Sequence, residues 1–359
     1  MKKVLLTTAQ IAVTIALLYF VFRDPAKRAQ MGTALQLANY WWMALAIVAY
    51  LVVEFAAAVR WQVLMRVQGI RLSNTRVFGL FLIGMFYNQF MPGGTGGDII
   101  KSYLLLKETP DKKAGALLAV VFDRVIGLIA LIGITGILIF LRYDYLAQTP
   151  ETRRLLYVLL IVLGSSVLGL VTSFLISGFH LVHRLPHRFP GREKLIEISA
   201  AYHLYARHWR ATLVAFSMSL IAHLGTFTTF LCVAYALHAV DVRATPPTPV
   251  PVVDFFAIMP IERTISSLPI SFGGAGWREI VLQILLNNLA GVQKGVANLI
   301  GSLSFLVILI CSLPGGIVYF FYRATGHVKL KEMREEVGTV EHQVAMEGDA
   351  PVIAPSEWQ

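Results

Sequence analysis

The stretch VFGLFLIGMFYNQFMPGGTGGDIIKSYLLL, from Val77 to Leu106, is apolar except for a break at Pro92-Gly93-Gly94-Thr95-Gly96-Gly97 and the residues just after it. A helix that crosses a bilayer needs ~20 apolar residues, so the arm after the break, Asp98–Leu106, is too short to span alone. Broken backbone at membrane depth persists only where protein or a wet cavity satisfies its polar groups, because lipid offers no hydrogen bonds. The stretch therefore predicts two short helices joined at a break inside a membrane protein.

A second break with the same spacing occurs in the other half of the chain. Val252–Leu268 runs into Pro269-Ile270-Ser271-Phe272-Gly273-Gly274, and the apolar pattern resumes over Ala275–Leu286. Both breaks follow Pro-x3-Gly-Gly-x3-Lys/Arg: Pro92, Gly96, Gly97 and Lys101 in the first, and Pro269, Gly273, Gly274 and Arg278 in the second. A short pattern can recur by accident in a chain with 28 glycines, so an internal repeat and a chance recurrence both remain open.

The composition places the whole chain in the membrane class. Of its 359 residues, 56% are hydrophobic and 14% are charged, against roughly 25% charged in an average globular chain, and the mean hydropathy is +0.66. These values exclude a disordered protein, a coiled coil and an ordinary cytosolic enzyme. The formal net charge of +10 is better explained by membrane topology than by nucleic-acid binding. The apolar runs long enough to span are Val4–Phe22, Trp41–Val59, Ala114–Leu141, Leu155–Phe179, Ala211–Leu237 and Val296–Tyr322.

The Lys and Arg positions predict how the chain is threaded through the membrane. With six spans, a cytoplasmic N-terminus and both breaks in re-entrant hairpins, the cytoplasmic side holds more than twice as many Lys and Arg as the external loops. The first hairpin then enters from the cytoplasm and the second from outside. We therefore predict an all-α polytopic fold built as an inverted repeat. Its membrane domain is 1–323, with halves of about 1–141 and 155–323, followed by a mobile cytoplasmic tail, 324–359.

The chemistry of each break favours an anion. The helix that restarts after Gly97 or Gly274 points unpaired N–H groups and the positive end of its dipole into the gap. Lys101 and Arg278, one turn further on, add full positive charge, so a phosphate is the simplest ligand. Asn88, just before the first break, either hydrogen-bonds a headgroup or satisfies the broken helix. No metal site is expected.

Further charges lie in membrane segments, where each costs ~2.5–3.5 kcal/mol if it faces lipid. They must be paired, hydrated or protonated. The candidates for charge balance or proton coupling are Asp98, Asp123, Arg124, Glu262, Arg263 and Glu279. The alternative role is an ion pair that merely locks helices together.

The pairing of these charges is only partly constrained by the sequence. Neighbours on a helix point about 100° apart, so Asp123 is expected to pair with another element rather than with the next residue. Pairs across the repeat, Glu262 with Lys101 and Asp123 with Arg278, are options. Glu54 is expected at the membrane interface near Arg60, and Arg60 itself is expected in a cytoplasmic loop.

These residues resemble a known family. Asn88-x3-Pro92-Gly-Gly-Thr-Gly-Gly-Asp98-x2-Lys101, the Asp123-Arg124 pair, and Leu268-Pro-Ile-Ser-Phe-Gly-Gly-x-Gly-x-Arg278-Glu279 resemble the flippase-like family related to the transmembrane region of lysylphosphatidylglycerol synthase, or multiple peptide resistance factor. The similarity extends over roughly Lys3 to Arg323. It implies a bacterial or archaeal multi-pass protein with re-entrant helices that moves lipids between leaflets. The soluble aminoacyl-transfer domain of the synthase has no counterpart in these residues, so lysyl transfer is not expected.

The function expected from the sequence is that of a secondary lipid translocase in the bacterial inner membrane, with both termini cytoplasmic. A phosphate-containing lipid headgroup (of a phospholipid, an aminoacylated phospholipid or a polyprenyl-phosphate-linked lipid) would enter a central polar cavity between the hairpins. No cofactor is expected, because Ile100 stands before Lys101 where a nucleotide-binding P-loop requires Gly. The partners expected are membrane lipids, not nucleic acid.

Two alternatives belong to other classes. An integral-membrane glycosyltransferase that uses a polyprenyl-phosphate sugar needs an acidic residue in an external loop, for which Asp24 and Asp144 are the candidates. A scaffold that partners a lipid-modifying enzyme is the other. Neither acidic residue lies in an Asp-x-Asp pair, so a transporter is favoured over an enzyme.

Overall fold

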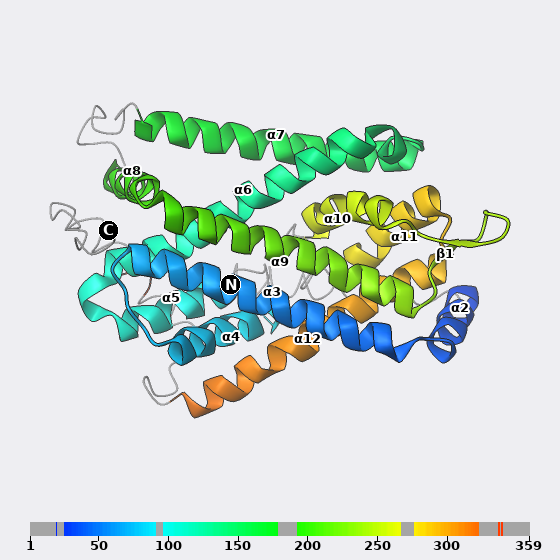
Figure 1. The fold of residues 1–359 in the computed structure, drawn as a ribbon, viewed down its shortest axis with the longest axis horizontal. Coiled ribbons are helices and arrows are strands. Elements are labelled where there is room, and N and C mark those ends of the chain that lie inside the picture. The colour runs from blue at the N-terminus through cyan, green and yellow to red at the C-terminus, as the bar shows by residue number, and fades with distance from the viewer. Residues whose placement is uncertain are drawn as a thin grey trace.

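The structure is a computed structural model that describes residues 25–90, 96–178, 192–266 and 276–322, with the single positions Tyr19, Val337 and Thr339. Within these residues it is almost entirely helical, and its strands are the short antiparallel pair β1 (Val240–Asp241) and β2 (Thr248–Pro249) (Figure 1). The predicted all-α polytopic class is confirmed. Pro92, Pro269, Gly273, Gly274 and most of the predicted tail lie outside the described residues, and the division into halves stays a prediction.

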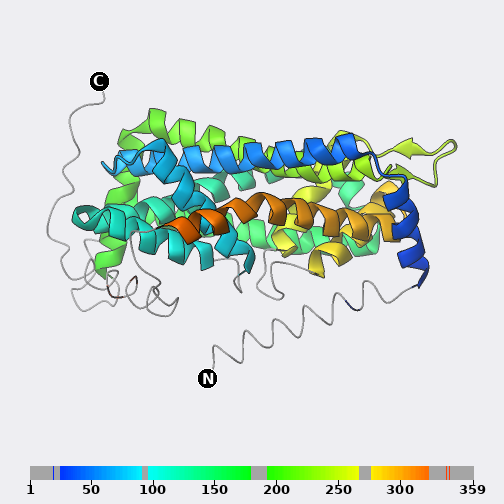
Figure 2. The same ribbon diagram turned by 90° about the horizontal axis from the view of Figure 1, so that it is seen from below.

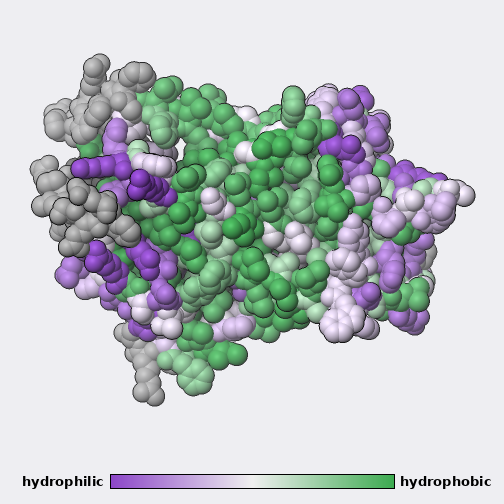
Figure 3. All heavy atoms as spheres, viewed as in Figure 1, coloured by the Kyte–Doolittle hydropathy of each residue, from purple (hydrophilic) through white to green (hydrophobic). Residues whose placement is uncertain are grey.

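Among the described residues, five helices are long and apolar enough to cross a membrane. They are α3 (Tyr40–Val67), α6 (Lys113–Leu146) with the preceding 3-10 turn η1 (Pro110–Lys112), α7 (Pro150–Gly178), α9 (Trp209–Ala236) and α12 (Lys294–Phe321). They coincide with five of the predicted spans, and the remaining one, Val4–Phe22, lies outside the described residues. Hydrophilic residues gather at the two ends of these helices, with a hydrophobic band between them (Figure 3). This surface matches a bilayer crossed along the long axis of the molecule.

The shorter helices occupy the ends and the two halves of this body. α2 (Pro25–Gln36) and α8 (Arg192–Arg207) lie across opposite ends, roughly perpendicular to the long helices (Figure 2). α4 (Asn74–Phe90) and α5 (Gly96–Glu108) lie in the half that contains α8, whereas α10 (Val252–Ser266) and α11 (Trp277–Ala290) lie in the other half (Figure 1). Each predicted break therefore falls between two short helices, and the two pairs lie in opposite halves of the molecule.

Each short pair packs in its own apolar core. The larger core contains α10, α11, α9, much of α12 and the first half of α3, including Tyr50 and Ala56. The smaller core contains α4, α5, the start of α6 and the second half of α3, from Ala58 onward. α3 thus belongs to both cores, and the change from one to the other occurs near its middle.

Local hydrogen bonds explain where the short helices begin. The Gly97 N–H donates to Asn88 Oδ1 at 2.9 Å, which caps α5 with a side chain from α4. A Cβ at Gly97 would lie 1.9 Å from the Gly84 carbonyl oxygen, so only glycine permits this approach of the two helices. At α11 the Gly276 N–H donates to Glu279 Oε2 at 2.7 Å, and the helix ends at Gly291 with φ of +63°.

A second close approach joins α12 to the first pair. A Cβ at Gly315 of α12 would lie 1.9 Å from the carbonyl oxygen of Leu82 in α4 and 2.9 Å from the Cβ of Phe86. The contact is with backbone, which cannot move aside as a flexible side chain would. Packing of this kind through small residues is how membrane helices approach closely, since lipid provides no hydrophobic force between them.

Gly315→Ala is therefore expected to destabilise the fold by roughly 1–3 kcal/mol, the usual cost of overpacking. The measurement is thermal unfolding of the detergent-solubilised protein. Gly136→Ala in α6 is the matched control, because a Cβ there meets nothing within 4 Å. Equal melting temperatures for the two variants would contradict the packing described for α12.

Candidate functional site

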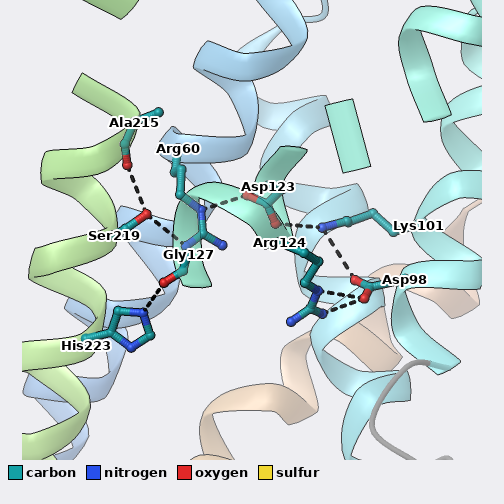
Figure 4. Close-up of polar contacts among 9 residues, drawn as sticks. All are labelled: Arg60, Asp98, Lys101, Asp123, Arg124, Gly127, Ala215, Ser219 and His223. Carbon is teal, nitrogen blue, oxygen red and sulfur yellow. Dashed lines mark hydrogen bonds and ion pairs between the residues drawn. The ribbon is translucent and has the colours of Figure 1, made fainter. Parts of the chain in front are cut away.

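Lys101 is the centre of a buried charge cluster in the first half of the molecule. Its side chain, on α5, is 4% exposed. The ammonium Nζ lies 3.3 Å from Asp123 Oδ2 on α6 and 3.7 Å from Asp98 Oδ1, one turn earlier on α5. The Trp61 ring lies under it, with its centre 4.7 Å from Nζ. The predicted partner Glu262 is therefore wrong for Lys101, which is neutralised by carboxylates of its own half (Figure 4).

Two arginines complete this cluster, which we call the Lys101 cluster. Arg60 Nε donates to Asp123 Oδ1 at 2.7 Å, and Arg124 lies 2.6 Å from Asp98 Oδ2 (Figure 4). Arg60, Lys101 and Arg124 carry three positive charges against the two carboxylates, Asp98 and Asp123. The cluster thus retains one formal positive charge. Arg60, Lys101 and Asp123 are buried, whereas the Arg124 side chain is 56% exposed, so the excess charge is accessible to an additional anion.

Arg60 is a site residue that the sequence analysis placed wrongly in a cytoplasmic loop. α3 continues to Val67, beyond the predicted end of the span at Val59, and Arg60 is 9% exposed. Its Nη1 also donates to Ser219 Oγ on α9 at 3.2 Å. The buried position is tolerable because Asp123 supplies the opposite charge from another helix. The uninterrupted helical pattern through Trp61 was the signal available in the sequence.

The residues around the first break serve the helix start. Asn88 Oδ1 is occupied by the Gly97 N–H, so this oxygen satisfies the broken helix rather than facing a ligand. Gly96 and Gly97 are both buried. The arrangement fixes the direction of α5 and with it the position of Lys101, one turn further along.

Arg278 is the corresponding cation in the second half. It lies on α11, is 4% exposed, and its Nε is 3.7 Å from Oε1 of the fully buried Glu262 on α10. The Phe305 ring of α12 lies against the guanidinium, with 4.7 Å from Cζ to the ring centre. The predicted pairing of Asp123 with Arg278 is therefore wrong. We call Arg278, Glu262 and their neighbours Arg263 and Glu279 the Arg278 cluster.

Glu279 is held in a structural position. Its Oε2 accepts from the Gly276 N–H, and its Oε1 accepts from Ser302 Oγ of α12 at 3.1 Å. Arg263 is partly buried, and its charge lies within electrostatic reach of Tyr50 on α3 and His223 on α9. The two clusters thus approach each other through α3 and α9, although no ion pair joins Lys101 to the Arg278 cluster in the described part of the chain.

A cavity of about 460 Å3 lies between α7 and α8, lined in part by Ser173, Ser177, Ser199 and Tyr202. No member of the Lys101 or Arg278 cluster lines it. The polar cavity predicted between the hairpins is not this one. Arg60, Lys101 and Arg278 are instead buried beside carboxylates of their own clusters, whereas Arg124 remains exposed.

The glycosyltransferase alternative needs an acidic residue in an external loop. No group of three or more His, Cys, Asp or Glu side chains that would hold a metal ion occurs in the part of the chain that the structure describes. Asp144, one acidic candidate for glycosyl transfer, is exposed near the end of α6, and the other, Asp24, lies outside the described residues.

Five span-length helices that enclose buried, paired charges define a multi-pass α-helical membrane protein. Residues 7–316 match the family described as lysylphosphatidylglycerol synthase TM region, and the chain belongs to this family. It is also similar to the UPF0104 membrane protein PH1989 of Pyrococcus horikoshii, with 28% identity over 179 residues. That alignment covers 49% of each chain, so it spans about half the length of the curated relative.

Asp123 is the shared acceptor of Arg60 and Lys101, which predicts a large effect of its removal. Asp123→Asn leaves two buried cations without a carboxylate on α6, and breaking a buried pair from one side typically costs ~3–5 kcal/mol. We expect a corresponding fall in the melting temperature of the solubilised protein. Asp111→Asn is the control, because Asp111 lies at an exposed position in η1. A melting temperature unchanged by Asp123→Asn would show that the buried pair does not hold the helices.

A separate ion pair joins the beginning of α4 to the end of α5. Arg76 of α4 pairs with Glu108 at the end of α5, and the Tyr322 hydroxyl, just after α12, donates to the same carboxylate. The Arg76 guanidinium also lies over the Tyr322 ring, 4.4 Å from its centre. Burial acts to raise the pKa of Glu108, but the hydrogen bonds from Arg76 and Tyr322 outweigh it and hold the pKa below its usual 4.5.

This lowered pKa predicts a pH-dependent contribution to stability. A carboxyl whose pKa is lower in the folded state stabilises the fold fully above its unfolded pKa, and the contribution disappears as the pH falls through the folded value. The difference in melting temperature between wild type and Glu108→Gln should therefore be largest near pH 7. It should shrink as the pH falls below 4.5. A difference that grows on acidification would contradict the assignment.

Proposed function

We propose that this protein is a secondary lipid translocase that moves a phosphate-containing lipid between leaflets. The proposal rests on two pairs of short helices, α4–α5 and α10–α11, in opposite halves of the molecule. Each pair contains a buried cation beside a carboxylate. Family membership supports a lipid-related membrane function. On this proposal α4–α5 and α10–α11 are re-entrant hairpins that enter from opposite sides, as in transporters built from inverted repeats.

The proposed transport step is an exchange of ion-pair partners. In the Lys101 cluster, Asp98 and Asp123 neutralise the cations when no lipid is bound. A phosphate headgroup would replace part of this carboxylate contact at Lys101 and Arg124, while the acyl or polyprenyl chains stay in the bilayer. Such an exchange avoids a state with an unpaired buried charge, which would cost several kcal/mol. The residual positive charge of the cluster supplies the attraction for the headgroup.

The second cluster serves the same headgroup in the other half. Arg278, beside Glu262 on α10, would take over the phosphate when the lipid passes the middle of the membrane. Two similar cation sites of opposite orientation would let the headgroup enter from either side of the membrane. Transport would then need no energy source other than a gradient across the membrane. The distribution of Lys and Arg supports cytoplasmic termini in a bacterial inner membrane. A partner lipid-modifying enzyme would supply the lipid.

The proposal is tested by reconstitution in liposomes that contain fluorescently labelled phosphatidylglycerol, with dithionite quenching to follow movement between leaflets. Lys101→Gln and Arg278→Gln are each expected to lower the translocation rate about tenfold or more, equivalent to ~1.4 kcal/mol of lost stabilisation. Lys113→Gln is the control, because Lys113 begins α6 at an exposed position. Gel filtration of each variant before reconstitution verifies that it is folded.

Two results would contradict different parts of the proposal. Rates unchanged in both cluster variants would remove Lys101 and Arg278 as the substrate site. Absence of movement of phosphatidylglycerol, lysyl-phosphatidylglycerol and a polyprenyl-phosphate lipid by folded wild-type protein would contradict the translocase itself.

A further inference from the structure

Glu54 occupies a position that neither the sequence analysis nor the proposed transport step explains. It lies 14 residues after Tyr40 and 13 before Val67, and at 1.5 Å per residue it is about 20 Å from both ends of α3. Its side chain is buried, with the residue only 4% exposed. Its expected position at the membrane interface is therefore wrong: Glu54 lies at the middle of the span.

The Glu54 carboxyl has no opposite charge to balance it. Its Oε1 is buried without a hydrogen-bond partner, and no ion pair involves Glu54 in the described residues. Arg60, the expected neighbour, is already engaged by Asp123 and Ser219. Burial of an isolated carboxylate is far more costly than burial of the neutral acid. A proton bound to the Glu54 carboxyl would avoid this cost.

The ionisable groups around Glu54 come from the helices packed against α3. Tyr50 lies one turn earlier on α3, and Cys311 of α12 is within electrostatic reach of the carboxyl. On α9, Gly225 packs against Val53 beside Glu54, and the nearby His223 ring bonds the Gly127 carbonyl of α6 at 2.9 Å.

Tyr50 connects Glu54 to the Arg278 cluster. Besides Glu54, the groups whose charge reaches the Tyr50 hydroxyl are Arg263 of α10 and Arg278 of α11, together with Cys311. Tyr50 is therefore within electrostatic reach of both Glu54 and the two guanidiniums, and a negative charge at Glu54 would act on the Arg278 cluster through Tyr50.

We infer that Glu54 is a proton-binding site and that its protonation state controls the Arg278–Glu262 pair during transport. The step is a simple binding equilibrium, in which the carboxylate takes up one proton from one side of the membrane and releases it to the other. Asp98 and Asp123 are ion-paired and Glu279 caps α11. Both oxygens of the fully buried Glu262 also lack a hydrogen-bond partner, but Arg278 Nε lies 3.7 Å from Oε1, whereas no cation lies at this distance from Glu54 in the described residues. The coupling rests on the proposed function, whereas the bound proton does not.

The bound proton is tested first, without any transport. The infrared difference spectrum of wild type minus Glu54→Gln, recorded on the full chain in lipid nanodiscs at pH 7, should contain the carbonyl band of a protonated carboxyl. Glu108→Gln is the matched control and should give no such band, because Glu108 is ionised in its pair with Arg76. Absence of the band for Glu54 would overturn the inference. Glu54→Asp, which keeps a carboxyl, should retain a shifted band.

The coupling is tested in liposomes with labelled phosphatidylglycerol and an imposed pH gradient. Wild type should respond to the direction of the gradient, and Glu54→Gln should lose this response while it still moves the lipid without a gradient. A wild-type rate that is independent of the gradient would overturn the coupling. Failure of wild type to move any lipid contradicts the proposed function instead, and the infrared result then stands alone.

Discussion

The ion pairs around Asp123 are the interactions on which the rest of the site depends. A single carboxylate on α6 accepts Arg60 from α3 and Lys101 from α5, and so connects three helices at one buried point. Without Asp123, Arg60 would be a buried charge with no carboxylate in contact, and Lys101 would keep only the longer contact with Asp98, at 3.7 Å. The short helix α5 can remain in the protein interior because its charged residue finds this partner.

The buried charge in the second half of the molecule is paired in a different way. Arg278 and Glu262 face each other within one pair of short helices, 3.7 Å apart, rather than across three elements. The spacing of the two breaks is alike, yet their charges are balanced in different ways. The two halves are thus similar in backbone pattern and dissimilar in electrostatics, and the Lys101 cluster alone carries a residual positive charge. A ligand with one negative charge would find different environments at the two ends of its path.

The sequence predicted the class of fold and, of its six expected spans, the five that lie in the described residues, because long apolar runs and short arms around Pro and Gly are local signals. It placed Lys101 and Arg278 inside membrane segments for the same reason, although it expected them to face a polar cavity. It did not predict their partners, since pairing depends on which helix faces which, and helix packing in membranes is set by small residues such as Gly97 and Gly315. Arg60 was misplaced because the predicted span ended at Val59, just before this charge, whereas α3 continues to Val67; Glu54 was placed too near the interface for the same reason.

The contacts of α12 have a mechanical consequence. Gly315 rests against the backbone of α4, while Gly301, four turns earlier on the same helix, rests against Leu282 and Glu279 of α11. One helix therefore touches both pairs of short helices, at two glycines that contribute no side chain to the contact. Tilting of either pair would press on α12, so the positions of the two pairs are mechanically linked.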